Sequence, residues 1–174
     1  MNRVLRICVF AGAMSAGAAQ AAPSSVGLDQ ALKDGVSVCN TIVQSAYSAA
    51  ADPALTLAPA SNDARPANLK GFFFKDVSDV KWASRPSTTG AVFIGWSAQA
   101  TKCSVFVLGT FADTALDNLR QHLETTHTAG AFGKDGKVRG YENAAGSVTL
   151  IQKDYVAGQA SDTLTAVVTI RGAE

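Results

Sequence analysis

Apolar residues recur every three or four positions across residues 28–47, which is the spacing of one face of an α-helix. The stripe consists of Leu28, Ala31, Leu32, Val36, Cys39, Ile42, Val43, Ala46 and Tyr47. Ser24 or Ser25 offers an N-cap, and Asp29 then lies in or near the first turn, where the helix dipole favours an anion. Gly35 weakens the middle of this helix by about 1 kcal/mol relative to alanine. We therefore predict a helix that buries one face.

Beyond residue 70 the hydrophobic period changes to two, which is typical of β-strands. Strands are predicted at residues 71–75, 77–83, 91–97, 103–108, 137–142, 147–153 and 163–171. The segment 103–108 is apolar on both sides, as expected of a central strand. The last segment alternates cleanly between aliphatic residues and threonines, so we expect one of its sides to face a core and the other to be wetter.

A second helical stripe lies at residues 112–126, where Ala112, Ala115, Leu116, Leu119 and Leu123 share a face. Thr110 and Asp113 have the spacing of a capping box at its start. This order of elements, with short turns between the strands, predicts an α+β fold. We expect a mostly antiparallel sheet of about five or six strands, with two helices packed on one face.

Residues 49–68 show no hydrophobic period and contain Pro53, Pro59 and Pro66. We predict an extended surface connection there. A loop of about 20 residues is uncommon inside a compact domain, and such loops are often functional.

The first 21 residues have the layout of a secretory signal peptide. Arg3 and Arg6 precede an apolar run at residues 7–19, and Ala19-Gln20-Ala21 supplies small residues at the −3 and −1 positions of a cleavage site. The run is shorter than the ~20 residues that cross a bilayer as a helix. We therefore expect residues 1–21 to be removed, and residues 22–174 to form a single globular domain without a transmembrane segment.

Charge gives no sign of a nucleic-acid partner. Without Arg3 and Arg6, the 15 basic residues fall to 13 against 14 acidic residues, so the net charge of the expected mature chain is −1. Nucleic-acid binding proteins carry a clustered basic face, and a polybasic membrane-surface protein has a similar excess of cations. Neither class fits this sequence.

Two cysteines remain after leader removal, because Cys8 lies within residues 1–21. In an oxidising compartment we expect Cys39 and Cys103 to form a disulfide that joins the first helix to the sheet. Closing a loop of about 65 residues would stabilise the fold by roughly 4 kcal/mol in the chain-entropy account. Free-thiol catalysis and metal binding are the alternatives, although neither cysteine is in a C-x-x-C pair.

The search for catalytic or cofactor chemistry yields no motif. His122 and His127 are five positions apart, whereas a zinc-protease H-E-x-x-H motif needs four, so we predict no metal site. No G-x-S-x-G sequence or phosphate-binding glycine loop is present, and we predict no cofactor. The carboxylate pairs Asp76/Asp79 and Asp113/Asp117 are interpreted as solvated surface.

Phe72, Phe73 and Phe74 form the most hydrophobic spot of the expected mature chain. Side chains on a strand alternate between its two faces, so three successive phenylalanines require either two covered faces or an exposed ring. Core packing is one interpretation. The other is a partner contact at Phe72, Phe73, Phe74 and Lys75, because exposed aromatic patches mark interaction sites.

The function that we expect from these features is that of a small, exported, periplasmic bacterial protein that binds a protein partner without catalysis. An inhibitor, an immunity-type protein and an envelope accessory protein all fit this description. The alternatives are a small envelope hydrolase, with His122 in a site assembled only by folding, and a carrier of an apolar ligand held between helix and sheet.

Overall fold

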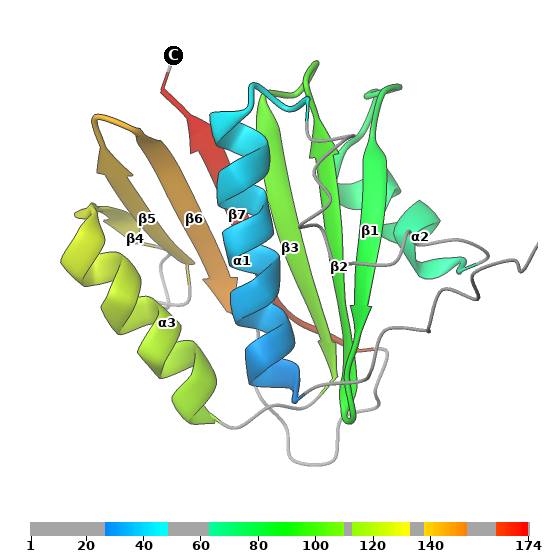
Figure 1. Cartoon of the computed structure of the whole chain (residues 1–174), viewed down its shortest axis with the longest axis horizontal. Coiled ribbons are helices and arrows are strands. Elements are labelled where there is room, and N and C mark those ends of the chain that lie inside the picture. The colour runs from blue at the N-terminus through cyan, green and yellow to red at the C-terminus, as the bar shows by residue number, and fades with distance from the viewer. Residues whose placement is uncertain (1–26, 49–62, 110–112, 133–137, 153–162, 174) are drawn as a thin grey trace, which may run out of the picture.

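A seven-stranded antiparallel sheet forms the centre of the computed structural model, which describes residues 27–48, 63–109, 113–132, 138–152 and 163–173 (Figure 1). The strands are β1 (Lys81–Pro86), β2 (Gly90–Ser97), β3 (Lys102–Gly109), β4 (Thr128–Phe132), β5 (Val138–Asn143), β6 (Gly146–Gln152) and β7 (Leu164–Gly172). Their order across the sheet is β1-β2-β3-β7-β6-β5-β4. The predicted α+β class with an antiparallel sheet is confirmed.

Two meanders build this sheet, and they join at its middle. One consists of β1, β2 and β3, the other of β4 to β7, and the seam is the antiparallel pair β3 and β7. Cys103 lies opposite Ile170 in this pair, and Phe106 lies opposite Val167. Because β3 and β7 are central, their side chains are buried on both faces, as expected for β3 from its sequence.

Helix α1 (Leu28–Gln44) lies over the central strands on one face of the sheet (Figure 1). Its apolar stripe forms a core with inward-facing side chains of β2, β3 and β7, which include Ile94, Val105 and Val168. The N-cap is Gly27, which makes no side-chain cap hydrogen bond, so the prediction that Ser24 or Ser25 caps this helix is wrong. Asp29 does lie in the first turn.

The disulfide between Cys39 and Cys103 is present, as predicted. It links α1 to β3 across a sequence separation of 64 residues, with the two Cα atoms 5.4 Å apart. Both cysteines are fully buried in the core beneath α1. The bond therefore fixes the helix to the middle of the sheet.

Helix α3 (Asp113–Thr126) lies beside α1 on the same face and covers the half of the sheet that contains β5 and β6 (Figure 1). Leu116, Leu119 and Leu123 pack into the same core as Tyr141 and Leu150. The predicted capping residue Thr110 lies outside the described residues. The two helices on one face thus match the sequence-based expectation.

A third helix, α2 (Arg65–Phe73), covers part of the opposite face and replaces two predicted features. Residues 65–68 are helical and do not belong to an extended connection, and residues 71–75 are not a strand. Pro66 occupies the first turn, where proline is favoured, and Asp63 accepts a hydrogen bond from the backbone N–H of Arg65 (2.9 Å). Only Pro66, Leu69 and Phe73 face inward, a stripe too short to show a clear helical period.

Two strands also differ from the prediction, β1 in its bounds and β4 in its presence. The strand predicted at residues 77–83 corresponds to β1, which occupies Lys81–Pro86, because Val77 and Val80 pack in a bent segment against the core under α2. Strand β4 was missed, since it is only five residues long and pairs with β5 alone. No helix in the described part of the chain is long and apolar enough to cross a membrane.

Gly35 permits the close approach of α1 to the sheet. A Cβ atom at this position would lie 2.9 Å from Cγ1 of Val105 and 3.1 Å from Cγ1 of Val92. The sequence-based view that Gly35 only weakens the helix is therefore incomplete, because the missing side chain is what lets the helix axis approach two strands.

We predict that Gly35→Ala destabilises the protein by roughly 1–3 kcal/mol through overpacking, although alanine is the better helix former. Gly71→Ala in α2 is the matched control, since a Cβ there meets no atom within 4 Å. We expect this control to stabilise by up to about 1 kcal/mol. Urea unfolding of both variants measures the difference, and stabilisation by both substitutions would contradict the close packing of α1.

Candidate functional site

The three phenylalanines have three different environments at the end of α2. Phe74 is 1% exposed and packs edge-to-face on Trp82, with ring centroids 5.9 Å apart. Phe73 is half-buried against Phe106 at 5.0 Å. Phe72 is 85% exposed, and it is the single large hydrophobic side chain that is exposed in the described part of the chain. The core interpretation therefore holds for Phe74, whereas Phe72 and the exposed Lys75 remain available to a partner.

Lys102 holds the end of α2 against the sheet. Its Nζ donates a hydrogen bond to the backbone carbonyl of Phe73 and lies 4.5 Å from the centre of the Phe74 ring. Burial, together with the nearby Arg171, lowers the pKa of Lys102 below its usual value. A cation at the carbonyl end of a helix stabilises that end, so the position of Phe72 depends on a contact between two elements.

Asp79 organises the turn between β2 and β3. Its carboxylate accepts a hydrogen bond from the Ser97 hydroxyl, and others from the backbone N–H groups of Ala98 and Gln99, both at 3.1 Å. The Ser97 hydrogen bond, followed by that of Gln99, lowers the pKa of Asp79. Asp79 was interpreted as solvated surface, and its contacts show a structural role in the turn.

The two histidines occupy separate positions near the end of α3. His122 is exposed and lines a groove of about 460 Å³ between α1 and α3, beside Leu119 and Val36. The Nδ1 atom of His127 lies 2.8 Å from the Thr126 hydroxyl oxygen. Within the described residues, no three His, Cys, Asp or Glu side chains are grouped so as to hold a metal ion. The groove places His122 between the helices, away from the α2 end.

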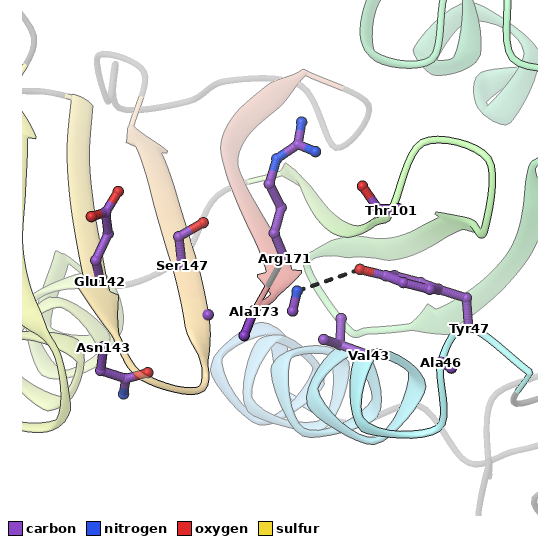
Figure 2. Close-up of a pocket in the computed structure, with 11 residues that line it drawn as sticks. Val43, Ala46, Tyr47, Thr101, Glu142, Asn143, Ser147, Arg171 and Ala173 are labelled. Atoms are coloured by element: carbon purple, nitrogen blue, oxygen red, sulfur yellow. Dashed lines mark hydrogen bonds between the residues drawn. The ribbon is translucent and has the colours of Figure 1, made fainter.

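A pocket of about 600 Å³, which we call the sheet-end pocket, lies where α1 and β7 end (Figure 2). Four segments line it: the end of α1, the turn between β2 and β3, the hairpin of β5 and β6, and the end of β7. The lining residues are Val43, Ala46, Tyr47, Thr101, Glu142, Asn143, Gly146, Ser147, Arg171, Gly172 and Ala173. The sequence placed Val43, Ala46 and Tyr47 on the apolar stripe of a helix and assigned none of the lining residues to a site, because no local motif connects the four segments.

Backbone strain is concentrated around the sheet-end pocket. Ala46, Tyr47 and Thr101 have φ angles of 51°, 63° and 46°, and they are three of the four non-glycine residues with positive φ in the described chain. The N–H groups of Ala46 and Tyr47 bond to the carbonyls of Val43 and Ile42, which forms a Schellman motif at the end of α1. Glycine is the usual residue at the first of these positions. Left-handed non-glycine residues cost of order 1–3 kcal/mol each and cluster at functional sites.

The lining residues also include opposite charges. Their side chains lie on the sheet face turned away from α1, because the strand neighbours Tyr141, Val148 and Ile170 belong to the core under α1. Arg171 of β7 lies opposite Ser147 of β6, which in turn lies opposite Glu142 of β5. Residues directly opposite in an antiparallel pair point to the same face, and Figure 2 shows the three side chains on one side of the strands. An Arg171 N–H donates to the carbonyl of Ala100 at 3.2 Å.

Comparisons of the chain with family models, with curated proteins and with solved structures find no match. Two regions stand out: the exposed end of α2 around Phe72, which the sequence analysis identified, and the sheet-end pocket, which it did not.

We predict that Asp79→Asn lowers the free energy of unfolding at pH 7, and that the deficit shrinks in acid. A carboxyl group whose pKa is lowered by folding adds stability that is complete above its unfolded pKa, near 3.8, and is lost as the pH falls through the folded value. Asp76→Asn is the matched control, since the Asp76 carboxylate accepts no hydrogen bond from the described residues. Urea unfolding between pH 7 and pH 2.5 measures both variants, and a deficit that is independent of pH would contradict this role of Asp79.

Proposed function

We propose that this chain is an exported, periplasmic protein that binds a protein partner through one surface of α2. We define the α2 surface by the exposed residues Ala67, Asn68, Gly71, Phe72 and Lys75. The observation that carries the proposal is the 85% exposure of Phe72, next to two phenylalanines that pack inward. Aromatic side chains are frequent anchors of protein interfaces, where they fill a pocket of the partner.

The α2 surface is rigid enough to present this ring. Leu69 and Phe74 anchor the helix in the core, and Lys102 donates a hydrogen bond to the carbonyl of Phe73, the last residue of the helix. The neighbouring Gly71 has no side chain to crowd the Phe72 ring, and a Cβ atom built at Gly71 would meet no other atom within 4 Å. The ring therefore stands clear of its neighbours on a fixed support, and a preformed anchor lowers the entropic cost of binding.

The charges beside Phe72 indicate the chemistry of the partner. Lys70 lies two residues before the ring and the exposed Lys75 three residues after it. Two of the three nearby carboxylates are engaged elsewhere, since Asp63 is paired with Arg65 (2.6 Å) and Asp79 is bonded to the β2–β3 turn, which leaves the exposed Asp76 against the two lysines. Complementary potentials favour association, so the expected partner is a protein with an apolar pocket rimmed by aspartate or glutamate.

Export is the second part of the proposal. The buried disulfide between Cys39 and Cys103 fits an oxidising compartment, and residues 1–21 have the signal-peptide layout described above. We predict that protein isolated from the periplasm of a Gram-negative host starts near Ala22, as measured by intact mass. In denaturant, which exposes the two buried cysteines, they should resist alkylation until a reductant is added. A chain that retains residues 1–21, or that has two alkylatable thiols, would contradict export.

We predict that a photoreactive benzoylphenylalanine in place of Phe72 crosslinks to one protein of the native periplasm. An excess of the purified unchanged protein should abolish the crosslink. Burying a phenylalanine contributes about 1.5–3 kcal/mol, so Phe72→Ser should compete roughly 10- to 100-fold less well. Lys75→Glu should also compete less well, because it reverses a charge that faces the acidic rim.

Two controls separate binding from folding. Lys33→Glu, on the exposed side of α1, should compete like the unchanged protein. The unfolding free energy of Phe72→Ser should be nearly unchanged, whereas Phe74→Ser should lose several kcal/mol, since Phe74 is 1% exposed. If Phe72→Ser competes with the crosslink as well as the unchanged protein does, the proposal that the α2 surface binds the partner is contradicted. Phe72-dependent sedimentation with phosphatidylglycerol vesicles, without a protein crosslink, would assign the surface to lipid instead.

A further inference from the structure

We propose that the groove between α1 and α3 binds a free carboxylic acid with a medium-length alkyl chain, such as octanoate. This interhelical groove has a floor of Leu32, Val36 and Leu119, and its walls are polar side chains of the two helices. It lies on the opposite face of the sheet from the α2 surface. Its volume of about 460 Å³ is within the range of small-molecule sites in proteins.

The groove exists because each helix is packed on the sheet and the two helices are not closed against each other. Gly35 and the disulfide hold α1 close to β2 and β3, and Leu116 and Leu123 of α3 belong to the same core. Between the helices, Ser37 and Asn118 occupy positions where large apolar side chains would fill the contact. Figure 1 shows α1 and α3 next to each other on one face of the sheet.

The floor of the groove is apolar and elongated. Leu32 and Leu119 belong to the core, and the half-buried Val36 packs against it. An alkyl chain laid on these side chains removes apolar surface from water on both partners. The α1 wall runs from Lys33 to Asn40, which is roughly 10 Å at ~1.5 Å per residue. This length is close to that of an extended octanoate chain.

The charge of the groove selects an anion. Lys33 is exposed, no carboxylate is among the described lining residues, and none of the described residues places one within ion-pair distance of the Lys33 ammonium. Asp34 and Asp117 adjoin the groove in sequence, but both are paired with arginines that do not line it. One ammonium balances one negative charge, so the charge fits a monocarboxylate.

The walls also offer hydrogen-bond donors for the head of such a ligand. The side chains of Ser37, Asn40, Asn118 and His122 line the groove and make no hydrogen bond to the described residues. Hydroxyl and amide groups each carry a donor, and in either tautomer one histidine ring nitrogen carries a hydrogen. A carboxylate near Lys33 can therefore accept further hydrogen bonds, while the alkyl chain covers the floor.

Other occupants fit this groove less well. Phe72 of a second copy would bring its exposed neighbour Lys75 towards Lys33, and like charges oppose that contact. The carrier expected as an alternative from the sequence would hold its ligand between helix and sheet, where the buried core around Cys39 and Cys103 is packed. The interhelical groove is open to solvent and needs no such displacement.

The test is an NMR titration of the oxidised protein with octanoate, octanamide, octylammonium and butyrate. We expect octanoate to shift the backbone amides of Val36, Ser37 and Leu119 saturably. Octanamide should bind roughly fivefold more weakly, because it lacks the charge that faces Lys33, and octylammonium should bind more weakly still. Butyrate should bind at least tenfold more weakly than octanoate, because it covers less of the apolar floor.

Four variants test the position of the ligand. Lys33→Glu should reverse the order, so that octylammonium binds more tightly than octanoate. Lys81→Glu is the matched control at an exposed lysine of β1, where the same change of net charge should leave the order as it was. Ser37→Trp should fill the groove and weaken octanoate binding at least tenfold, whereas Gln44→Trp, at another exposed position of α1, should not.

Phe72→Ser should bind octanoate like the unchanged protein, so loss of the partner crosslink and loss of groove binding are separate results. Absence of saturable shifts up to millimolar octanoate would overturn the proposal. An order of affinities that Lys33→Glu leaves unchanged would overturn it as well, and so would shifts centred on Phe72.

Discussion

The contact of α1 with the centre of the sheet is the constraint on which the remaining arrangement depends. A disulfide between two fully buried cysteines attaches the helix to β3, and Gly35 lets the helix approach Val92 and Val105 closely. The disulfide and the Gly35 contact lie at different turns of the helix, so together they fix its distance from the sheet and its direction across the strands. Because the sheet is formed by two meanders that meet at β3 and β7, the same helix also covers the seam between them.

The opposite face of the sheet has a different organisation. Under α2, Phe74, Trp82 and Phe106 form an aromatic cluster on β1 to β3. Gly95 leaves room for this cluster, since a Cβ there would lie 2.8 Å from Trp82 and 3.1 Å from Phe74. Phe73 and Phe74 pack against Phe106. Because successive residues of a helix point in different directions around its axis, Phe72 then points outward. Its exposure is thus a consequence of how its neighbours are buried, and an interface built on it needs no rearrangement of the core.

The sheet-end pocket depends on the first constraint. The direction of α1 determines where Ala46 and Tyr47 lie, and the antiparallel register determines that Arg171, Ser147 and Glu142 share a row. Residues that are 125 positions apart, such as Tyr47 and Gly172, become hydrogen-bonded neighbours. The two candidate sites therefore use different parts of one scaffold, a helix end on one face and a strand-end pocket around β7.

Local patterns in the sequence were sufficient for much of this protein. The stripes of α1 and α3, the strands β2, β3, β5, β6 and β7, and the pairing of Cys39 with Cys103 all follow from periodicity and composition, because burial of one face imposes a repeat on the chain. Helix α2 and strand β4 did not follow, since nine and five residues are too few to establish a period. The outward position of Phe72, the role of Asp79 in a distant turn, and the row from Arg171 to Glu142 were decided only by the tertiary structure. Strand order and register bring these residues to their places, and both arise from packing between segments that are far apart in the chain.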